Sequence, residues 1–157
     1  MSEKLFEKYS LEDVEIRDKS LKQVVSLKPI SIPYSAGRHV KKPLGKMHVN
    51  IVERLANKLM RGGTGEKTSG KVIRTQGNLQ GKKLKVLRIV EEAFDLVAEK
   101  TKENPVQVLI KALENSAPRE DVTRVSYGGV SYQIAVDVSA TRRLDMALRN
   151  MALAGIM

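Results

Sequence analysis

The chain has 157 residues, no cysteine and a formal net charge of +10 at pH 7. Its length fits one domain with one core, and the lack of cysteine excludes disulfide frameworks, zinc ribbons and cysteine nucleophiles. No window approaches the roughly 18 consecutive apolar residues of a membrane span, and the first ten residues lack the pattern of a secretion signal. We therefore expect a soluble, cytoplasmic protein with no membrane partner.

The positive charge is concentrated in the middle of the chain. Residues 36–88 contain fourteen Lys or Arg and only two acids, Glu53 and Glu66, whereas residues 1–35 and 89–157 are nearly balanced. A solvated lysine-rich face normally interleaves both signs. Segregation of this kind favours a polyanion site and indicates a nucleic acid as the partner.

The first third of the chain predicts little regular structure. Residues 2–9 are typical of a short helix opened by Ser2, and residues 26–46 carry three prolines and two glycines. A segment punctuated in this way is expected to be extended and to order on a partner. We assign residues 1–48 to an N-terminal extension that ends in a basic arm, whose candidate contacts are Arg38, Lys41, Lys42 and Lys46.

Three helices are predicted to form the core of a helical domain over residues 49–157. Asn50 and Glu53 are placed as the N-cap and capping-box partner of a helix over residues 49–60. A long helix follows from Lys82, and its expected buried stripe is Leu84, Leu87, Val90, Phe94, Val97 and Thr101, widened by Val86, Ile89, Ala93 and Ala98. Asn104, Pro105 and Gln107 then supply the start of a third helix, which ends before Pro118.

The loop between the first two of these helices resembles a phosphate-binding loop only in part. It reads RGGTGEKTSGK from Arg61 to Lys71, and Glu66 stands where that motif needs a glycine directly before its Lys-Thr pair. A carboxylate there repels the anion, and a helix precedes the loop where the motif requires a strand. Nucleotide hydrolysis is therefore the weakest alternative, and Lys67, Lys71 and Arg74 remain candidate contacts for a longer polyanion.

Between residues 121 and 138 the apolar period changes from that of a helix to that of a strand. Tyr127-Gly128-Gly129-Val130 predicts a two-residue hairpin turn, because both central positions need a positive φ. Pairing outward from this turn places Tyr127, Val130, Val125, Tyr132, Thr123 and Ile134 on one face. Since a two-stranded ribbon is marginal alone, it either packs on the helices or projects and is held by a partner. Ser139 is expected to cap a last helix with Leu144, Ala147, Leu148, Met151 and Ala152 inward.

Basic residues stand at the starts of two predicted helices. Lys82, Lys83 and Lys85 open the long helix, and Arg142 and Arg143 open the last one. A helix N-terminus disfavours cations by roughly 0.3–1 kcal/mol each, and a bound phosphate would reverse that sign. The alternative is that these side chains are exposed and the penalty is tolerated.

Metal and acid–base chemistry find little support in the chain. His39 and His48 have no further histidine or cysteine to complete a metal set, so we expect no metal and no cofactor. No nucleophile-and-base pair is visible, and Tyr127 and Tyr132 are as well explained by packing as by stacking on bases.

Four segments in order resemble one known family. They are NIVERLANKLMRGG, GKKLKVLRIVEEAFDLV, ENPVQVLIKALENSAPRED and VDVSATRRLDMALRNMA, and the N-terminal pieces KLFEKYSLEDVEIRD and PYSAGRHVKKPLGK extend the likeness over nearly the whole chain. The chain resembles the archaeal and eukaryotic type of the small-subunit ribosomal protein seven family. In that family helical and basic structure follows the last helix predicted here, so we do not expect the contacts of that portion among these residues.

The resemblance implies a mainly α fold, a helical bundle with one protruding β-hairpin and an extended basic arm, and no catalytic activity. It implies binding to the 3′ major domain of small-subunit ribosomal RNA and a role in starting assembly of the subunit head, next to neighbouring head proteins. The implied RNA contacts, besides the basic arm, are Arg54, Lys58, Arg61, Gly81, Lys82, Lys83, Arg119, Arg124, Arg142 and Arg143. The hairpin tip, from Tyr127 through Gly128 and Gly129 to Val130, would lie near the exit-site transfer RNA and the messenger path. A DNA-binding or general RNA-chaperone module is the main alternative.

Overall fold

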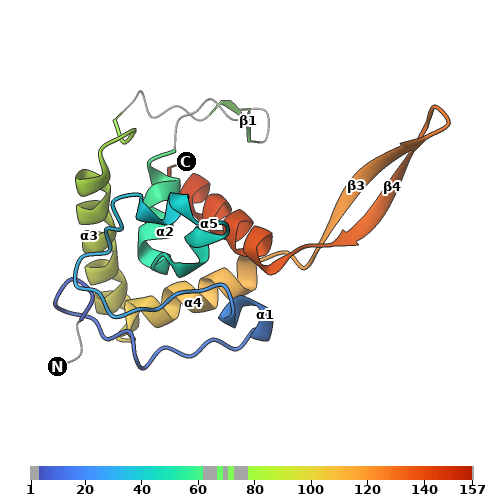
Figure 1. The fold of residues 1–157 in the computed structure, drawn as a ribbon. Helices are drawn as coiled ribbons and strands as arrows, with labels where there is room; N and C mark the ends of the chain where they lie inside the picture. The colour runs from blue at the N-terminus through green and yellow to red at the C-terminus, as the bar shows by residue number, and fades with distance from the viewer. Residues whose placement is uncertain (1–3, 62–66, 69–70, 73–77, 157) are drawn as a thin grey trace.

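The computed structural model describes residues 4–61, 67–68, 71–72 and 78–156. Figure 1 shows a cluster of helices with the hairpin projecting from one side. The elements in chain order are α1 (Lys19–Lys22), the 3-10 helices η1 (Arg38–Lys41) and η2 (Gly45–His48), α2 (Ile51–Leu59), β1 (Lys67–Thr68), β2 (Lys71–Val72), α3 (Lys83–Thr101), α4 (Pro105–Ser116), β3 (Glu120–Tyr127), β4 (Val130–Asp137) and α5 (Ala140–Ile156). The predicted helical domain with a protruding β-hairpin, β3–β4, is confirmed, and β1 and β2 form a second, short antiparallel pair that the sequence did not indicate.

Helix α2 lies at the centre of the domain, where it packs on both α3 and α5, and α4 closes the core from below. Ile51, Val52 and Ala56 are fully buried on α2. Their spacing places them on one side of the helix, and Leu144 and Leu148 of α5 are equally buried. The inward face predicted for the last helix is therefore confirmed.

Both predicted N-cap asparagines are confirmed, and each has a second role. Asn50 Oδ1 accepts a hydrogen bond from the Val52 amide at the start of α2, and Asn104 Oδ1 accepts one from the Val106 amide at the start of α4. The free Nδ2 groups donate to carbonyls of the N-terminal extension, at Lys28 and Ser10. Each cap therefore also fastens the extension to the helical core.

The two predicted capping-box partners are used for the same purpose. Gln107 bonds the backbone of Glu15 in both directions, accepting from its amide and donating to its carbonyl. Glu53 accepts from the amide and hydroxyl of Ser35. In each case the side chain that the local pattern assigns to its own helix start holds a distant segment instead, because it accepts a hydrogen bond from a backbone amide of that segment.

The N-terminal extension lies along the helices and contributes to the core (Figure 1). Leu5, Leu11, Leu21 and Val24 are all buried there. The predicted helix over residues 2–9 is wrong for its described part, since residues 5–9 form a tight bend closed by a Leu5–Tyr9 bridge. Tyr9 is held there by its hydroxyl, which donates to Asp95 of α3 at 2.5 Å, and burial with this bond raises the pKa of Tyr9 to about 12.

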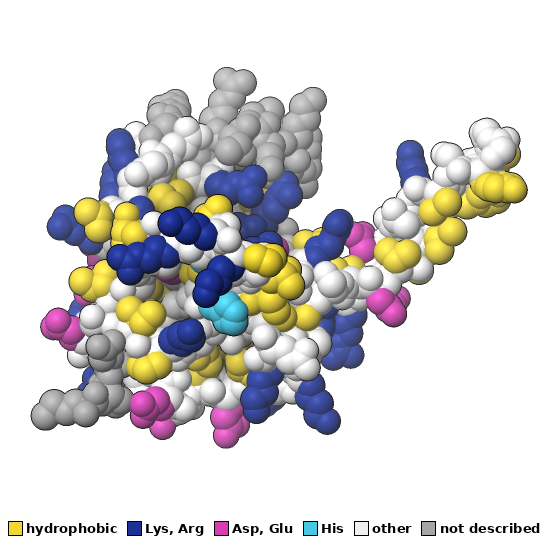
Figure 2. Space-filling model, viewed as in Figure 1, with side chains coloured by type: hydrophobic (Ala, Val, Ile, Leu, Met, Phe, Trp, Pro, Cys, Tyr) yellow, Lys and Arg dark blue, Asp and Glu magenta, His cyan; other side chains and the backbone are white. Residues whose placement is uncertain are grey.

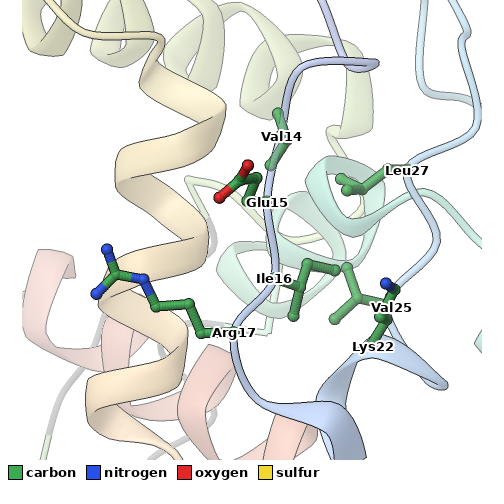
Figure 3. A pocket seen from close by; sticks show the side chains of 7 residues that line it. All are labelled: Val14, Glu15, Ile16, Arg17, Lys22, Val25 and Leu27. Atoms are coloured by element: carbon green, nitrogen blue, oxygen red, sulfur yellow. The ribbon is translucent and has the colours of Figure 1, made fainter.

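A shallow depression in the extension is lined by apolar side chains from two of its stretches. Figure 3 shows Val14 and Ile16 from the first stretch beside Val25 and Leu27 from the second, with Arg17 directed over α4. The backbone amide of Arg17 bonds Glu114 of α4. The extension is thus anchored to α4 through its backbone.

The basic arm is more regular than the expected extended segment, because η1 and η2 fold against each other. Gly45 is buried at this contact, and a Cβ there would lie 2.1 Å from the carbonyl oxygen of His39. Only glycine permits that approach. The arm therefore has a defined shape.

The predicted stripe of α3 is correct for four residues and wrong for four others, at the ends of the helix and along its flank. Val86, Leu87, Val90 and Phe94 are buried, whereas Leu84 is 70% exposed. The other predicted members of the stripe that lie exposed are Ile89, Ala93 and Thr101. Leu84 and Thr101 lie at the two ends of the helix, and Ile89 and Ala93 lie on the flank of its buried face, so the buried surface is shorter and narrower than predicted.

Candidate nucleic-acid interface

The start of α3 is joined to the start of α2 by a buried ion pair. Lys83 Nζ bonds Glu53 Oε1, and the same Nζ lies 4.4 Å from the centre of the Tyr34 ring. Glu53 is almost fully buried and also accepts both bonds from Ser35. Lys83 thus neutralises an interior carboxylate.

A second cluster forms around Asp145 in α5. Its carboxylate lies 2.5 Å from Lys46 Nζ, 3.1 Å from a terminal guanidinium nitrogen of Arg54 and 3.5 Å from Lys58 Nζ. Burial opposes ionisation of Asp145, but the bonds from Lys46 and Arg54 outweigh it, so its pKa lies below the ordinary value. Burial likewise lowers the pKa of Lys58, against the attraction of Asp145.

Arg54 and Arg143 are the two buried arginines among the described residues. Arg54 is 5% exposed and also donates to the Val24 carbonyl at 3.3 Å. Arg143 donates to Asp18 at 2.8 Å, to the Pro118 carbonyl at 3.1 Å and to the Ser20 hydroxyl. The bonds from Arg143 and Ser20 hold the pKa of Asp18 well below its usual range.

These contacts change the interpretation of the basic helix starts. The first turns of α3 and α5 contain no acid, as the sequence indicated. Lys83 and Arg143 are nevertheless compensated inside the protein, by Glu53 and by Asp18. The electrostatic argument for a bound phosphate therefore applies only to the exposed cations at these ends, among them Lys82.

Lys58 is half-buried, and the remaining predicted cations whose side chains are described are exposed. They lie on the arm, just after α2, at the start of α3 and on α5, with Arg119 and Arg124 just before and in β3. We call the described part of the chain outside the β3–β4 hairpin the helical body. Figure 2 shows several Lys and Arg side chains close together on one face of it. Two adjacent depressions share Lys46, Lys58, Arg61 and Asp145, and the second also includes Arg142 and Arg149. The exposed members of the predicted set are Arg38, Lys41, Lys42, Lys46, Arg61, Lys82, Lys85, Arg119, Arg124 and Arg142. Lys46, Arg61 and Arg142 of this set line the two depressions, and Arg38 and Lys42 lie beside them. We call these five residues the basic face.

Three predicted contacts lie in or beside the loop after α2. The backbones of Lys67 and Lys71 belong to β1 and β2, which pair antiparallel, but their side chains are not among those described. Arg74 lies outside the described residues. The element before the loop is helix α2, as expected for a chain without a nucleotide-hydrolase loop.

The hairpin has the predicted turn and register. Tyr127 pairs with Val130 and Val125 pairs with Tyr132, and the strands extend to Glu120 and Asp137. Gly128 and Gly129 have φ values of 59° and 81°, which the two-residue turn requires. The hairpin projects into solvent (Figure 1), and Tyr127 at its tip is 82% exposed.

One face of the projecting hairpin is apolar and exposed. Cross-strand alternation places on it Tyr127, Val130, Val125, Tyr132, Ile134 and Val136. Of the two alternatives for this ribbon, the structure therefore shows projection.

The comparisons with known proteins decide the family. Residues 23–155 match the model of the family described as "Ribosomal protein S7p/S5e". The small ribosomal subunit protein uS7 of Methanococcus maripaludis strain C6 is 51% identical over 153 residues, which cover 98% of this chain and 74% of that protein. The uS7 proteins of strain C7 and of strain S2 are 52% and 50% identical over the same lengths.

The chain belongs to the ribosomal protein S7 family. The resemblance noted in the sequence is thereby confirmed. Proteins of the S7 family are structural and not enzymatic, so this chain is not an enzyme. Each helix in the described residues is too short or too polar to cross a membrane.

The sequence of this S7 protein indicates the cations of the face but not the carboxylates that organise them. The local pattern assigns Glu53 only to the start of its helix, and nothing beside Asp18 or Asp145 in the sequence indicates their distant partners. A signal was present for Glu53, because it is one of two acids in a strongly basic third of the chain. An isolated acid there is best explained by an internal partner.

Proposed function

We propose that this S7 protein is a structural constituent of the small ribosomal subunit and that its basic face binds ribosomal RNA. Its membership of the S7 family and the name of its relatives support the ribosomal role. The observation that carries RNA binding is the set of exposed cations that the arm, α2 and α5 present around two shared depressions. This proposal also places the protein on the ribosome in the cytoplasm.

The chemistry of the face favours recognition of the phosphate backbone. Arg38 and Lys42 of the arm, Arg61 after α2 and Arg142 of α5 are all exposed. Cations from several elements can contact phosphates of different strands at once, which fixes a folded RNA without reading its bases. Lys82 and Lys85 extend the same chemistry to the start of α3, where helix N–H groups also favour an anion.

The buried members of the predicted set act differently in this proposal. Arg54, Lys83 and Arg143 are paired with Asp145, Glu53 and Asp18. We propose that they fix the elements that carry the exposed cations, so that their own contribution to RNA binding is through the shape of the face.

The finer proposal concerns the place of the protein in the subunit. We propose that it binds the 3′ major domain of the small-subunit RNA, that it starts assembly of the head, and that neighbouring head proteins adjoin it. The hairpin would lie near the exit-site transfer RNA and the messenger path. Its projection and its exposed tip at Tyr127 support a reach beyond the helical body.

Competition binding tests this function. The protein is bound to a structured fragment of the 3′ major domain, and unlabelled duplex DNA or the same RNA is added as competitor. Displacement by RNA at far lower concentration than by DNA is expected. Equal displacement by duplex DNA would favour the general nucleic-acid-binding alternative.

A matched pair of variants tests the assignment of the face. Arg61→Gln removes an exposed cation from the two depressions, and Lys111→Gln removes an exposed cation on α4 that pairs with Glu103. Arg61→Gln should weaken binding and reduce the slope of log affinity against log salt by roughly 0.7–0.9, as for one lost phosphate contact. Lys111→Gln should change neither quantity, and equal effects of the two variants would contradict the assignment.

A further inference from the structure

The basic arm is clamped to the helical body at both of its ends. Ser35, before η1, bonds Glu53 of α2 through its amide at 3.0 Å and its hydroxyl at 2.7 Å. Lys46, in η2, bonds Asp145 of α5 at 2.5 Å. Arg38, Lys41 and Lys42 lie between these two points. Their positions relative to the body therefore depend on both carboxylates.

Asp145 is the carboxylate that three cations share. Lys46 comes from the arm, and Arg54 and Lys58 come from α2. Without a negative charge among them these cations would repel one another, and Arg54 is too deeply buried to move into solvent. One carboxylate against three cations leaves the cluster positive, so the same residue holds the cations together and leaves them attractive to an anion.

The ion pair of Lys46 with Asp145 differs from the buried one of Arg54. The Lys46 side chain is half exposed, and such a pair adds little to the stability of a fold. It does, however, join the arm to α5, 99 residues further along the chain. Its main effect is therefore on the position of the arm.

We propose that Asp145 is a positioning residue for RNA binding: it fixes the arm against α2 and α5, and the protein binds RNA more tightly with this negative charge than without it. The inference rests on the proposed function of the basic face. A surface that is already ordered loses less conformational entropy on binding than one that must be ordered by the ligand. Simple charge counting gives the opposite expectation, because removal of a carboxylate from a basic face should attract RNA.

Asp145→Asn and Asp121→Asn separate the two expectations. Both remove one negative charge from an aspartate that pairs with an exposed cation of the face, and Asp121 pairs with Arg142 at 3.3 Å outside the arm. In binding to the structured RNA fragment, Asp145→Asn should weaken affinity by roughly three- to tenfold, the scale of one or two side chains that must be ordered again. Asp121→Asn should leave affinity unchanged or slightly higher. Asp145→Glu, which keeps the charge, should recover part of the loss.

Trypsin cleavage of the free protein reports on the arm without RNA. Cleavage after Arg38 and Lys41 should be faster in Asp145→Asn than in the wild type or in Asp121→Asn. Tighter RNA binding by Asp145→Asn, or unchanged cleavage of its arm, would overturn the inference while leaving the proposed function intact. Absence of binding by the wild type would overturn the proposed function and, with it, this inference.

A second pair of variants covers the case in which Asp145→Asn does not fold. Lys46→Met breaks the link to the arm but keeps the pair of Asp145 with Arg54, and Lys41→Met removes an equal charge from the same arm. Lys46→Met should weaken RNA binding more than Lys41→Met and should alone accelerate cleavage after Arg38. Equal affinities and equal cleavage for these two variants would refute the positioning role.

Discussion

The helical body and the hairpin of this S7 protein are stabilised in opposite ways. In the body, Leu144 and Leu148 are fully buried, the buried Arg54 and Arg143 bond Asp145 and Asp18, and the largely buried Lys83 bonds Glu53. In the hairpin, the side chains of β4 are exposed along its whole length, and the register follows from the turn at Gly128 and Gly129. The body is therefore organised by tertiary contacts, and the hairpin by local pairing that leaves an apolar face for a partner.

The largest expected effect on stability comes from a substitution that creates a cavity in the helical body. Leu148→Ala should lower the free energy of unfolding by about 2–5 kcal/mol, because the site is fully buried and cannot collapse completely. Val125→Ala in the hairpin should cost under about 1 kcal/mol, the scale of its cross-strand pair with Tyr132. Urea denaturation followed by far-UV circular dichroism measures both. Similar losses would contradict the distinction between the two regions.

The second-largest expected loss of stability comes from breaking the buried ion pair at the start of α3. Lys83→Ala should destabilise the protein by about 3 kcal/mol, because it leaves Glu53 buried without its cation. Its neighbour Lys82 is exposed, and Lys82→Ala should change stability by less than about 0.5 kcal/mol while weakening RNA binding. A stability change of the same size in both variants would show that the pair is not a tertiary contact of the body.

Acid pH should lower the stability of the helical body through protonation of Asp18. The folded-state pKa of Asp18 lies below the ordinary value of 3.8. The stability that its charge contributes is therefore complete above the unfolded-state pKa and is lost as the pH falls toward the folded-state pKa. Asp18→Asn should lower stability at neutral pH by about 2 kcal/mol, since it removes a charged partner of Arg143. Stability measured from pH 6 down to about pH 2 should fall less steeply in this variant than in the wild type. Identical slopes would exclude the Asp18–Arg143 pair as a source of the acid sensitivity.

The smallest expected effect on the body comes from the hairpin turn. Gly129→Val places a β-branched residue at a φ of 81° and should open the hairpin locally, by roughly 1–2 kcal/mol. Hydrogen exchange should then be faster at β3 and β4 amides but unchanged in α5. Ser131→Ala, in β4 next to the turn, should leave the exchange in the hairpin and in α5 unchanged. Faster exchange in α5 after Gly129→Val would show that the hairpin also supports the body.

Local patterns were sufficient to predict much of the fold. Asn50 and Asn104 marked two helix starts correctly, because a capping side chain acts within two residues of itself. The Gly-Gly turn fixed the pairing of Tyr127 with Val130 and all the pairs beyond it. The extent of burial along α3 was less predictable, because the exposure of Leu84 depends on which distant segments pack against that turn.

The sequence by itself determined that the cations are segregated, where the helices and hairpin begin, and which family the chain resembles. Only the tertiary structure decided which cations face solvent and which are paired inside the protein. Arg54 pairs with Asp145, which is 91 residues away in the sequence, and Arg143 pairs with Asp18, which is 125 residues away. Helical and strand periodicities report on neighbours a few residues apart, whereas the pairing of a buried charge depends on which distant segments the packed core brings together.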